Sequence, residues 1–224
     1  MSGTVLITGA NRGIGLALAH LYHDRGWQVI GVCRSSGNEV AELKEFATRV
    51  IEGVDVVAAA DVERLRQELA DTRLDVLINN AGLLRDDALG ELNVGDLRAQ
   101  MEVNAFAPLL VTEALLANLS SGSKVINITS RMGSIADNGS GGFYGYRASK
   151  AALNALGRSL AMDLKPRGIA VAQLHPGMVQ TRMINFTGQI SPEQAAAGLL
   201  DRIDELTLER SGSFWHSNGE ELPW

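Results

Sequence analysis

The stretch that decides the fold is residues 4–15, which read Thr4-Val5-Leu6-Ile7-Thr8-Gly9-Ala10-Asn11-Arg12-Gly13-Ile14-Gly15. Residues 4–8 are β-branched or apolar and predict a strand, and the apolar spacing after Gly13 predicts a helix. Between them Gly9 permits a sharp turn, Gly13 lets the backbone approach a phosphate group, and Gly15 lets the helix pack against the strand. This order predicts a pyrophosphate site at the helix N-terminus, where free N–H groups attract an anion, with a merely structural loop as the alternative.

The alternation of strand and helix continues along the whole chain. Candidate strands lie at residues 4–8, 28–33, 54–58, 76–79, 124–129, 169–174 and 213–216. This order predicts an α/β fold: a single doubly wound Rossmann-type domain with a mainly parallel sheet of about seven strands, helices on both faces and ligands at the carboxyl ends of the strands. We expect one domain over residues 1–224, with a dinucleotide-binding half at about 1–120 and a catalytic and substrate half at about 121–224.

Local signals mark several helix ends. Residues 191–194 combine an N-cap serine, a proline at the first helical position and a glutamine able to close a capping box, so a helix is predicted to begin there. Gly26 is expected to end the first helix, and Pro166 with Gly168 the helix that carries Tyr146.

Composition and charge exclude several classes of protein. Hydrophobic residues make up 46% of the chain and charged residues 21%, a balance typical of a globular rather than a disordered protein. The net charge of -6 and the lack of any Lys/Arg run predict no nucleic-acid partner and no anionic membrane surface. No apolar window approaches the roughly 20 residues of a membrane span and nothing resembles a signal peptide, so a cytoplasmic protein is expected.

Cysteine and histidine are too sparse for a disulfide or a metal centre. Cys33 is the single cysteine, and its position at a strand end favours a small apolar role over a reactive thiol. His20, His23 and His175 have no acid or thiol at metal-ligand spacing, so no metal is predicted.

The end of the second predicted strand indicates which dinucleotide is bound. A carboxylate that binds the ribose hydroxyls of NAD is expected about 20 residues beyond the glycines, and Arg34 lies there instead. Together with Arg12 in the glycine turn, it could hold a ribose 2′-phosphate through charge-assisted hydrogen bonds. The sequence therefore predicts NADP(H) in preference to NAD(H), with two solvated surface arginines as the alternative.

Tyr146 and Lys150 complete a set of motifs that identifies a family. Over essentially its whole length the chain resembles the short-chain dehydrogenase/reductase family, through five motifs in the family's order: residues 8–15, Asp61-Val62, Asn79-Asn80-Ala81-Gly82, Tyr146 with Lys150, and Pro176-Gly177 followed by Thr181. Residues 128–135 and the ending Leu222-Pro223-Trp224 resemble the C-factor or sniffer-like carbonyl reductase subgroup.

The resemblance implies which residues contact the cofactor. Asp61 and Val62 would lie against the adenine, and Asn80, Ala81 and Gly82 would line the cleft and support the central strand. The remaining cofactor-binding residues expected from the glycine turn, the second strand, the catalytic pair and the Pro-Gly motif are Gly9, Asn11, Arg12, Gly13, Ile14, Gly15, Arg34, Tyr146, Lys150, Pro176, Gly177, Val179 and Thr181.

Residues 146 and 150 are one helical turn apart, so they share a helix face. A free tyrosine has a pKa of about 10, and an ammonium about 4 Å away at an effective dielectric of about 20 contributes roughly 4 kcal/mol, enough to bring that pKa near 7. Tyr146 is thus the predicted acid/base, and Lys150 lowers its pKa and holds the nicotinamide ribose. Tyr144 lacks such a partner, because Ala148 lies four residues beyond it.

Ser130 and Asn104 are the other two catalytic candidates. Ser130 follows a strand and could donate a hydrogen bond to the substrate oxygen. It precedes Tyr146 by sixteen residues where the family usually has about thirteen, and extra residues in the 137–142 loop could absorb the difference, which favours Ser130 over Ser134. By resemblance, Asn104 would hold a water that relays protons to the lysine, with a helix-kinking asparagine as the alternative.

These features predict an NADP(H)-dependent oxidoreductase that transfers a hydride between nicotinamide and a carbonyl or secondary alcohol. The lid after Gly177 is short, which suggests a small or open pocket for an apolar aldehyde, ketone or quinone. The alternative is a cofactor-binding signalling or regulatory protein of the same fold, in which turnover is incidental. The family resemblance also suggests a homo-oligomer, with a dimer favoured.

Overall fold

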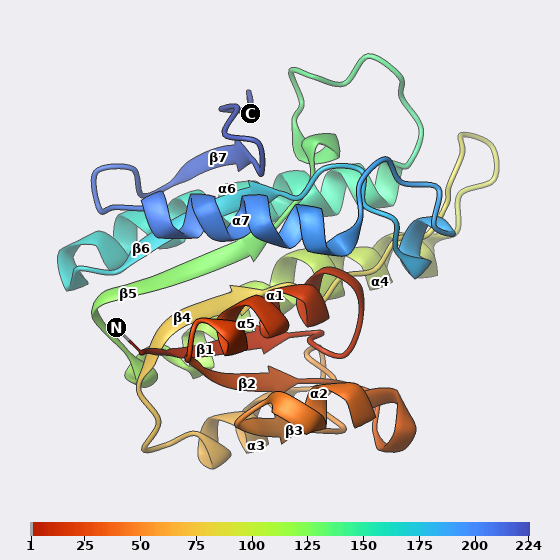
Figure 1. Cartoon of the computed structure of the whole chain (residues 1–224). Coiled ribbons are helices and arrows are strands. Elements are labelled where there is room, and N and C mark those ends of the chain that lie inside the picture. Colours follow the sequence, from red (N-terminus) through yellow and green to blue (C-terminus); the bar gives the residue numbers. More distant parts are fainter. Residues whose placement is uncertain (1) are drawn as a thin grey trace.

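Seven parallel strands form one sheet in the order β3-β2-β1-β4-β5-β6-β7 (Figure 1). The computed structural model describes residues 2–224. The strands are β1 (Thr4–Thr8), β2 (Gln28–Val32), β3 (Arg49–Ile51), β4 (Leu74–Asn79), β5 (Leu119–Ile128), β6 (Ala170–His175) and β7 (Ser213–His216). The predicted α/β fold with a doubly wound parallel sheet is confirmed. The strand order reverses between β1 and β4, which is where such sheets bind ligands.

The third strand is the one that the sequence misplaces. Residues 54–58 are predicted as a strand, but β3 is Arg49–Ile51, which pairs with residues 30–32 of β2. Gly53 adopts a left-handed conformation with φ of 64°, so the chain has turned out of the sheet before the apolar run begins. Val54 donates its N–H to the Cys33 carbonyl just beyond β2 at 3.0 Å, and its side chain is buried in the core.

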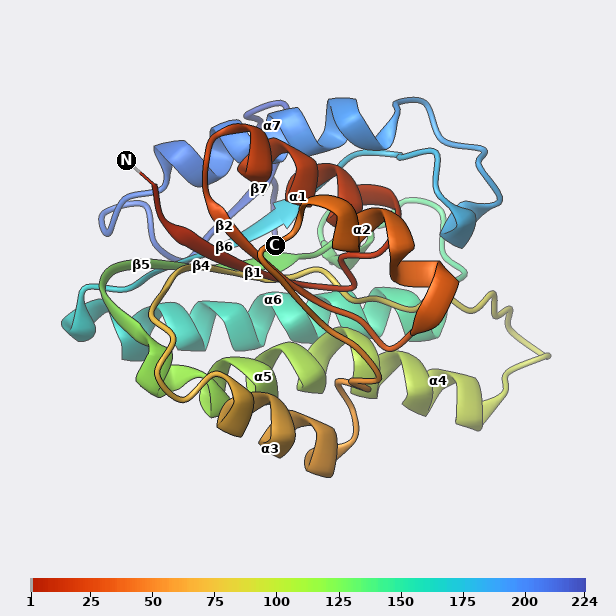
Figure 2. The ribbon, with the colours of Figure 1, turned by 60° about the horizontal axis from the view of Figure 1, so that its bottom comes forward.

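Helices cover both faces of the sheet (Figure 2). Those on one face are α1 (Gly13–Asp24), α2 (Ala41–Phe46) and α7 (Pro192–Glu205); those on the other are α3 (Ala59–Glu68), α4 (Val94–Met101), α5 (Ala107–Ala114) and α6 (Tyr144–Leu164). Between α4 and α5, residues Glu102–Phe106 form a π-helical turn, η2. Within residues 2–224, no helix is both long and apolar enough to cross a bilayer.

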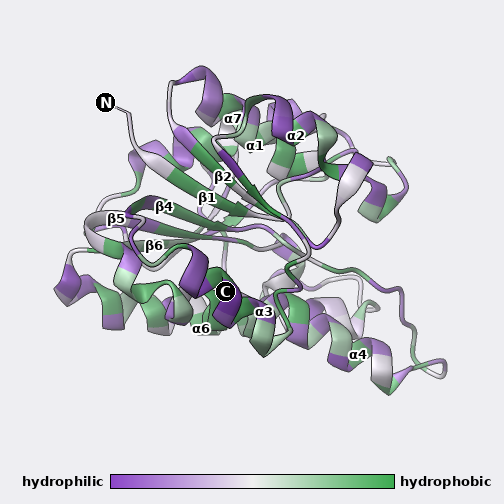
Figure 3. Cartoon of the chain, turned by 90° about the horizontal axis from the view of Figure 1, so that it is seen from below, coloured by the Kyte–Doolittle hydropathy of each residue, from purple (hydrophilic) through white to green (hydrophobic). Residues whose placement is uncertain are grey.

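Two apolar clusters hold the helices to the sheet. One includes Leu18 of α1 and Leu199 of α7, and the other includes Leu65 of α3 and Leu115 beside α5, all four of them buried. The strands are largely hydrophobic, while polar residues lie mainly on helices and loops (Figure 3). Near-continuous apolar strands are what a parallel sheet covered on both faces requires.

The predicted helix ends agree with the structure. Ser191 accepts a hydrogen bond from the Gln194 N–H while the Gln194 side chain accepts one from the Ser191 N–H, which closes the capping box before α7. Gly26 and Gly168 follow α1 and α6 in left-handed conformations, with φ of 74° and 73°. Glycine tolerates this region because it has no Cβ, so both helices end where the sequence predicts.

A row of buried amides fixes the register of the central strands. Asn79 Nδ2 donates to Asn127 Oδ1 at 3.0 Å, and Asn127 Nδ2 donates to Gln173 Oε1 at 3.2 Å. A Cβ on Gly157 would lie 2.2 Å from Gln173 Oε1, so only glycine lets α6 pack against this row. The row holds β4, β5 and β6 in line, and the loops that leave their carboxyl ends therefore meet at one edge.

Candidate active site

The glycine turn between β1 and α1 forms a cradle that fits a pyrophosphate. Gly9 and Gly13 have φ of 66° and 54°, and a Cβ on Gly15 would lie 2.3 Å from the Gly9 carbonyl oxygen. Any side chain at position 15 would therefore push the helix away from the turn. Arg12 precedes α1, and no side chain caps the first turn of that helix. Its N–H groups can thus bind an anion.

Neighbouring elements hold the turn in place. Thr8 Oγ1 accepts hydrogen bonds from the N–H groups of Asn80 and Ala81, and Asn80 Nδ2 donates to the carbonyls of Thr8 and Gly9. Asn11 Nδ2 donates to the Glu39 carbonyl at 3.2 Å. Ile14 packs against the core cluster under α1. The predicted turn residues are thereby brought together with the loop that follows β4.

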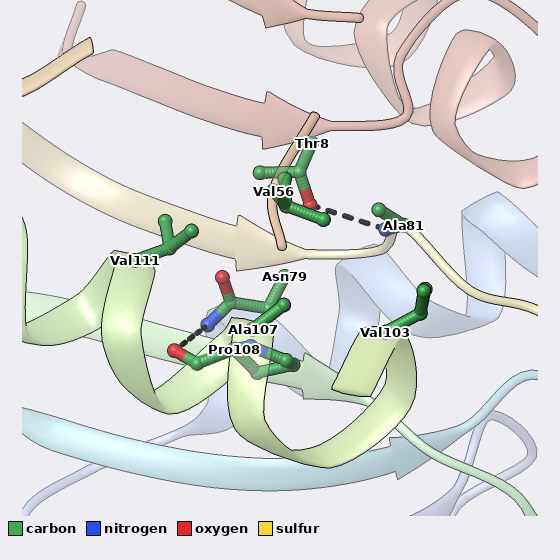
Figure 4. Close-up of a pocket in the computed structure, with 8 residues that line it drawn as sticks. All are labelled: Thr8, Val56, Asn79, Ala81, Val103, Ala107, Pro108 and Val111. Carbon is green, nitrogen blue, oxygen red and sulfur yellow. Dashed lines mark hydrogen bonds between the residues drawn. The ribbon is translucent and has the colours of Figure 1, made fainter. Parts of the chain in front are cut away.

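A narrow hollow lies beside this junction (Figure 4). Its walls combine Thr8 of β1, Ala81 of the loop after β4 and side chains of the helices beyond; the lining residues are Thr8, Val56, Asn79, Ala81, Val103, Ala107, Pro108 and Val111. Gly82 follows the lining residue Ala81 in sequence, and a Cβ on Gly82 would lie 3.5 Å from Asn104 Oδ1. The walls are mostly apolar.

Asp61 and Val62 lie within α3 rather than in the loop that reaches this hollow. Asp61 Oδ2 accepts a hydrogen bond from the Asp55 N–H at 2.9 Å, and the Val62 side chain belongs to the buried core. The residue of this segment that lines the hollow is Val56. The structure thus gives Asp61 a role in holding the loop and Val62 a role in packing.

Arg12 and Arg34 are both exposed, and in the described chain neither guanidinium pairs with a carboxylate. The Gly9 N–H donates to the Val32 carbonyl at 2.8 Å, so the turn that carries Arg12 adjoins the end of β2, and Arg34 follows that end by two residues. Cys33 is buried, and burial raises the pKa of its thiol to about 11. This agrees with the predicted apolar role of Cys33.

The Pro-Gly segment after β6 reaches across to the glycine turn. A Cβ on Gly13 would lie 3.3 Å from Thr181 Cγ2, so Thr181 adjoins the cradle. Val179 is buried and pairs with Ile190, while the Pro176 carbonyl accepts a hydrogen bond from Ser217 Oγ. Gly177 has φ of 92°, which favours glycine. The segment is therefore fixed at both ends beside the cradle.

Tyr146 and Lys150 are both buried in the first turns of α6, and Lys150 Nζ lies 5.8 Å from the centroid of the Tyr146 ring. The ammonium also donates to the Ile128 carbonyl at 2.9 Å, at the end of β5. The predicted pair is thus on one helix face and is anchored to the sheet edge.

The prediction that Lys150 draws the pKa of Tyr146 toward 7 is wrong for this structure. Burial raises the pKa of Tyr146 to about 12, with a hydrogen bond to Ser130 acting in the opposite direction. The ammonium lies over the ring and is held by the Ile128 carbonyl, so desolvation outweighs its attraction. Burial also lowers the pKa of Lys150 to about 8. At neutral pH the pair is therefore a neutral phenol beside an ammonium.

The two candidate serines have different partners. Ser130 is buried at the end of β5, interacts with Tyr146 and accepts a hydrogen bond from the Met132 N–H at 3.1 Å. The Ser134 hydroxyl donates to the Trp224 carbonyl and accepts from the Asp137 N–H. Ser130 is consequently the serine that the structure brings to the phenol.

Asn104 lies in the π-helical turn and is completely buried. Its Oδ1 accepts a hydrogen bond from the Leu83 N–H at 2.8 Å, and its Nδ2 donates to the Leu83 carbonyl at 2.7 Å and to Ser149 Oγ at 3.0 Å. Ser149 Oγ in turn donates to the Tyr146 carbonyl. Asn104 therefore connects the loop after β4 to α6, and π-helical turns are frequent at functional sites.

Two residues that were not predicted from the sequence, Ser149 and Gly133, hold α6 to its neighbours. Ser149 could have been recognised, because it lies between Tyr146 and Lys150 and a serine there can bond back to the preceding turn. Gly133 had no such signal: a Cβ there would lie 2.7 Å from the Lys150 carbonyl carbon, so the loop after Ser130 rests directly on the backbone of α6.

His175 is a buried titratable group beside the site. Burial, together with the nearby His216, Arg131 and Lys150, lowers its pKa to about 3, so it is neutral at ordinary pH. Across residues 2–224, no group of three or more His, Cys, Asp or Glu side chains lies close enough to hold a metal ion.

Comparisons with known proteins agree with this arrangement. The short chain dehydrogenase family matches residues 3–190. A protein of Rhodococcus sp. (strain AD45) named 1-hydroxy-2-glutathionyl-2-methyl-3-butene dehydrogenase is 44% identical over 227 residues, which cover 99% of each chain.

Two further matches concern the predicted subgroup and cofactor. C-signal of Myxococcus xanthus is 45% identical over 154 residues, which cover 67% of this chain and 93% of that protein. The crystal structure of NADPH-bound carbonyl reductase from chicken fatty liver superposes with a TM-score of 0.91 at 30% identity, covering 100% of this chain and 99% of that one. The similarity to C-factor and sniffer-like carbonyl reductases is thus confirmed.

The buried ammonium predicts that Lys150→Met stabilises the cofactor-free protein at pH 7. Lowering the lysine pKa from 10.5 to about 8 corresponds to roughly 3 kcal/mol, and loss of the bond to Ile128 offsets about 1 kcal/mol, which leaves a gain of about 2 kcal/mol. Urea unfolding of Lys150→Met and of wild type at pH 7 measures this difference in the free energy of unfolding.

The pH dependence of that gain follows from the same shift. Between pH 8 and 10.5 the lysine of the unfolded chain is protonated to a greater extent than that of the native chain. The free energy of unfolding of wild type therefore rises with pH in this range, and the difference from Lys150→Met disappears. A variant that is less stable than wild type at pH 7, or a gap that does not change with pH, would contradict the burial of a charged lysine.

Proposed function

The chain belongs to the short-chain dehydrogenase family, and from this we propose that it interconverts a carbonyl and an alcohol with NADP(H), using Tyr146 as the proton donor. It is an oxidoreductase that acts on CH–OH or C=O groups. The observation that carries the proposal is the buried trio of Tyr146, Lys150 and Ser130 at the sheet edge that also carries the glycine turn.

The residues of the cradle fit a dinucleotide with a 2′-phosphate. Gly9, Gly13 and Gly15 leave the space for a pyrophosphate. Arg12 and Arg34 are exposed, neither pairs with a carboxylate within residues 2–224, and the turn that carries Arg12 is hydrogen-bonded to the end of β2, which Arg34 follows. We assign them to the ribose 2′-phosphate, because charge-assisted hydrogen bonds from two guanidinium groups suit a dianion.

We assign the remaining cofactor contacts to residues that lie near the glycine turn. Asn80 and Ala81 are hydrogen-bonded to the glycine turn and Gly82 follows them, while Thr181 adjoins the turn from the other half of the chain. Pro176, Gly177 and Val179 belong to the segment that leads to Thr181. For the adenine, the family resemblance favours Asp61 and Val62, and Val56 of the same segment lines the hollow beside Thr8. Val179 would act through its backbone, since its side chain is buried.

NADPH, when bound, supplies the hydride that reduces the carbonyl carbon. Tyr146 then gives its phenolic proton to the developing alkoxide, and its high pKa means that the proton is present throughout the neutral range. Ser130, whose hydroxyl acts to lower the pKa of the phenol, would orient the substrate oxygen beside it. The two hydroxyls thus form one donor site.

Lys150 stabilises the phenolate left after proton transfer, because its ammonium lies over the same ring in a buried environment. We also assign it to the nicotinamide ribose. Asn104 would support the proton relay to Lys150: both N–H bonds of its amide are used, so a water would donate to the second lone pair of Oδ1.

The names of similar proteins limit the substrate to a class. One relative is named as the dehydrogenase of a 1-hydroxy compound and one structural neighbour as a carbonyl reductase. Exposed apolar side chains follow the Pro-Gly segment, namely Met178, Met183 and Phe186. We propose apolar aldehydes, ketones or quinones as substrates, to be identified by following NADPH oxidation across a panel of them.

Similarity to C-signal keeps a signalling role as the second candidate. The buried, hydrogen-bonded state of Tyr146 and Lys150 weighs against incidental turnover, because burying an ammonium is costly without a function. A strain in which Tyr146→Phe abolishes NADPH oxidation but keeps the biological role would favour signalling.

Tyr146→Phe removes the proton donor and keeps the ring. We expect the rate of carbonyl reduction to fall by about 10²- to 10⁴-fold, because general acid catalysis contributes that much. Tyr144→Phe is the matched control, since Tyr144 is half-exposed and two residues away, and it should stay near the wild-type rate. Equal rates for wild type and Tyr146→Phe, with NADPH saturating, would refute the assignment.

Arg34→Asp tests the preference for the phosphorylated cofactor. Loss of one charge-assisted contact and introduction of a repulsive carboxylate should lower kcat/KM for NADPH by at least about tenfold, with that for NADH unchanged or higher. Arg98→Asp, which changes an exposed arginine on α4, serves as the control. If the ratio of NADPH to NADH efficiency is the same in Arg34→Asp and wild type, Arg34 does not bind the phosphate.

A further inference from the structure

The first turn of α6 carries Tyr146 but begins without a cap of its own. Phe143, the residue before the helix, has a left-handed backbone with φ of 51° and ψ of 44°, and its side chain does not cap the helix. A bulky residue pays for this conformation in strain unless its surroundings impose it. The free N–H groups at the start of α6 therefore need an acceptor from elsewhere in the chain.

Asp87, from the loop between β4 and α4, supplies that acceptor. Its Oδ1 accepts a hydrogen bond from the Tyr144 N–H, and its Oδ2 accepts one from the Gly145 N–H at 3.0 Å. The Asp87 carbonyl also accepts from the Phe143 N–H at 3.2 Å. One residue, 57 positions away from the helix in sequence, thus binds three consecutive N–H groups just before Tyr146.

The contact between this loop and the helix has no spare room. A Cβ on Gly145 would lie 2.5 Å from Gln100 Nε2, 2.9 Å from Leu97 Cδ2 and 3.1 Å from Asp87 Oδ2. Only glycine lets the helix start come this close to the carboxylate and to α4. The chain between β4 and α4 runs beside the N-terminal end of α6 (Figure 2).

Buried amides anchor the loop that carries Asp87. Asn104 binds both backbone groups of Leu83, and Gln100 Oε1 accepts a hydrogen bond from the Arg85 N–H at 2.9 Å. Gln100 and Asn104 are completely buried, and Asn104 also donates to Ser149 of α6. Asp87 is therefore attached to the same rigid part of the molecule that contacts the catalytic helix one turn after Tyr146.

We propose that Asp87 is a positioning residue for proton transfer: its carboxylate binds the first N–H groups of α6 and thereby fixes the turn from which Tyr146 reaches the substrate oxygen. This rests on the proposed function, in which Tyr146 is the proton donor. Proton donation needs the two heavy atoms within about 3 Å, and a misplacement of about 1 Å can lower a rate about a hundredfold. Loosening the first turn of α6 should therefore impair proton transfer before it impairs cofactor binding.

Two Asp87 variants and a neighbour test the proposal. Asp87→Ala removes both acceptors, whereas Asp87→Asn keeps one side-chain oxygen; Asp86→Asn is the matched control, because Asp86 is exposed and adjacent. We expect kcat to fall about tenfold to a hundredfold in Asp87→Ala and less in Asp87→Asn. The Kd of NADPH, read from its fluorescence, should change less than about twofold, and Asp86→Asn should match wild type.

The solvent deuterium isotope effect on kcat separates positioning from a merely structural cap. If the Tyr146 hydroxyl is poorly aligned with the substrate oxygen, proton donation limits the rate more strongly, so the isotope effect should rise in both Asp87 variants. A cap that only supports folding would lower the melting temperature and leave the isotope effect of the folded protein unchanged. If Asp87→Ala does not fold, the test rests on Asp87→Asn. A wild-type kcat and a wild-type isotope effect in Asp87→Asn would overturn the proposal. A fall of kcat in Asp86→Asn equal to that in the Asp87 variants would also overturn it.

Failure of this inference differs from failure of the proposed function. If wild type oxidises NADPH with a carbonyl substrate and Tyr146→Phe does not, the function stands, and wild-type behaviour of Asp87→Asn rejects only the role of Asp87. If Tyr146→Phe keeps the wild-type rate, the proton donor is misassigned and Asp87 has no proton transfer to position.

Discussion

The rest of the site depends on a phenol and an ammonium buried side by side at the edge of a parallel sheet. Lys150 lies over the ring of Tyr146, donates to the Ile128 carbonyl and is buried. Burial raises the tyrosine pKa and lowers the lysine pKa, so each group is pushed toward its neutral form. In the proposed reaction the protonated tyrosine is the form that is consumed, and the ammonium beside it would stabilise the phenolate.

Close approach of backbones brings that pair to the cofactor cradle. Gly15 lets α1 reach the glycine turn, Gly157 lets α6 reach the amide row of the sheet, and Gly133 lets the loop after Ser130 rest on α6. These three contacts lie on different elements, yet each would be lost with a single Cβ. The arrangement at the carboxyl ends of the strands thus depends on these glycine positions as much as on the side chains that line the site.

Much of this arrangement could be predicted from the sequence, because its signals are local. The strand and glycine turn of residues 4–15, the capping box at Ser191 and the Tyr146-Lys150 spacing each involve only neighbours along the chain. Features that depend on distant partners were missed or misjudged. The third strand is at Arg49–Ile51, where it pairs with β2, and desolvation by the surrounding elements decides the pKa of Tyr146.

The central claim, that burial keeps Tyr146 protonated in the neutral range, is tested most directly by NMR of the protein with ¹³Cζ-labelled tyrosine. The chain has three tyrosines, and the resonance that disappears in Tyr146→Phe belongs to Tyr146. Its chemical shift should remain that of a protonated phenol up to at least pH 10, because the pKa is raised to about 12. A resonance that titrates near pH 7 in the cofactor-free protein would contradict the account.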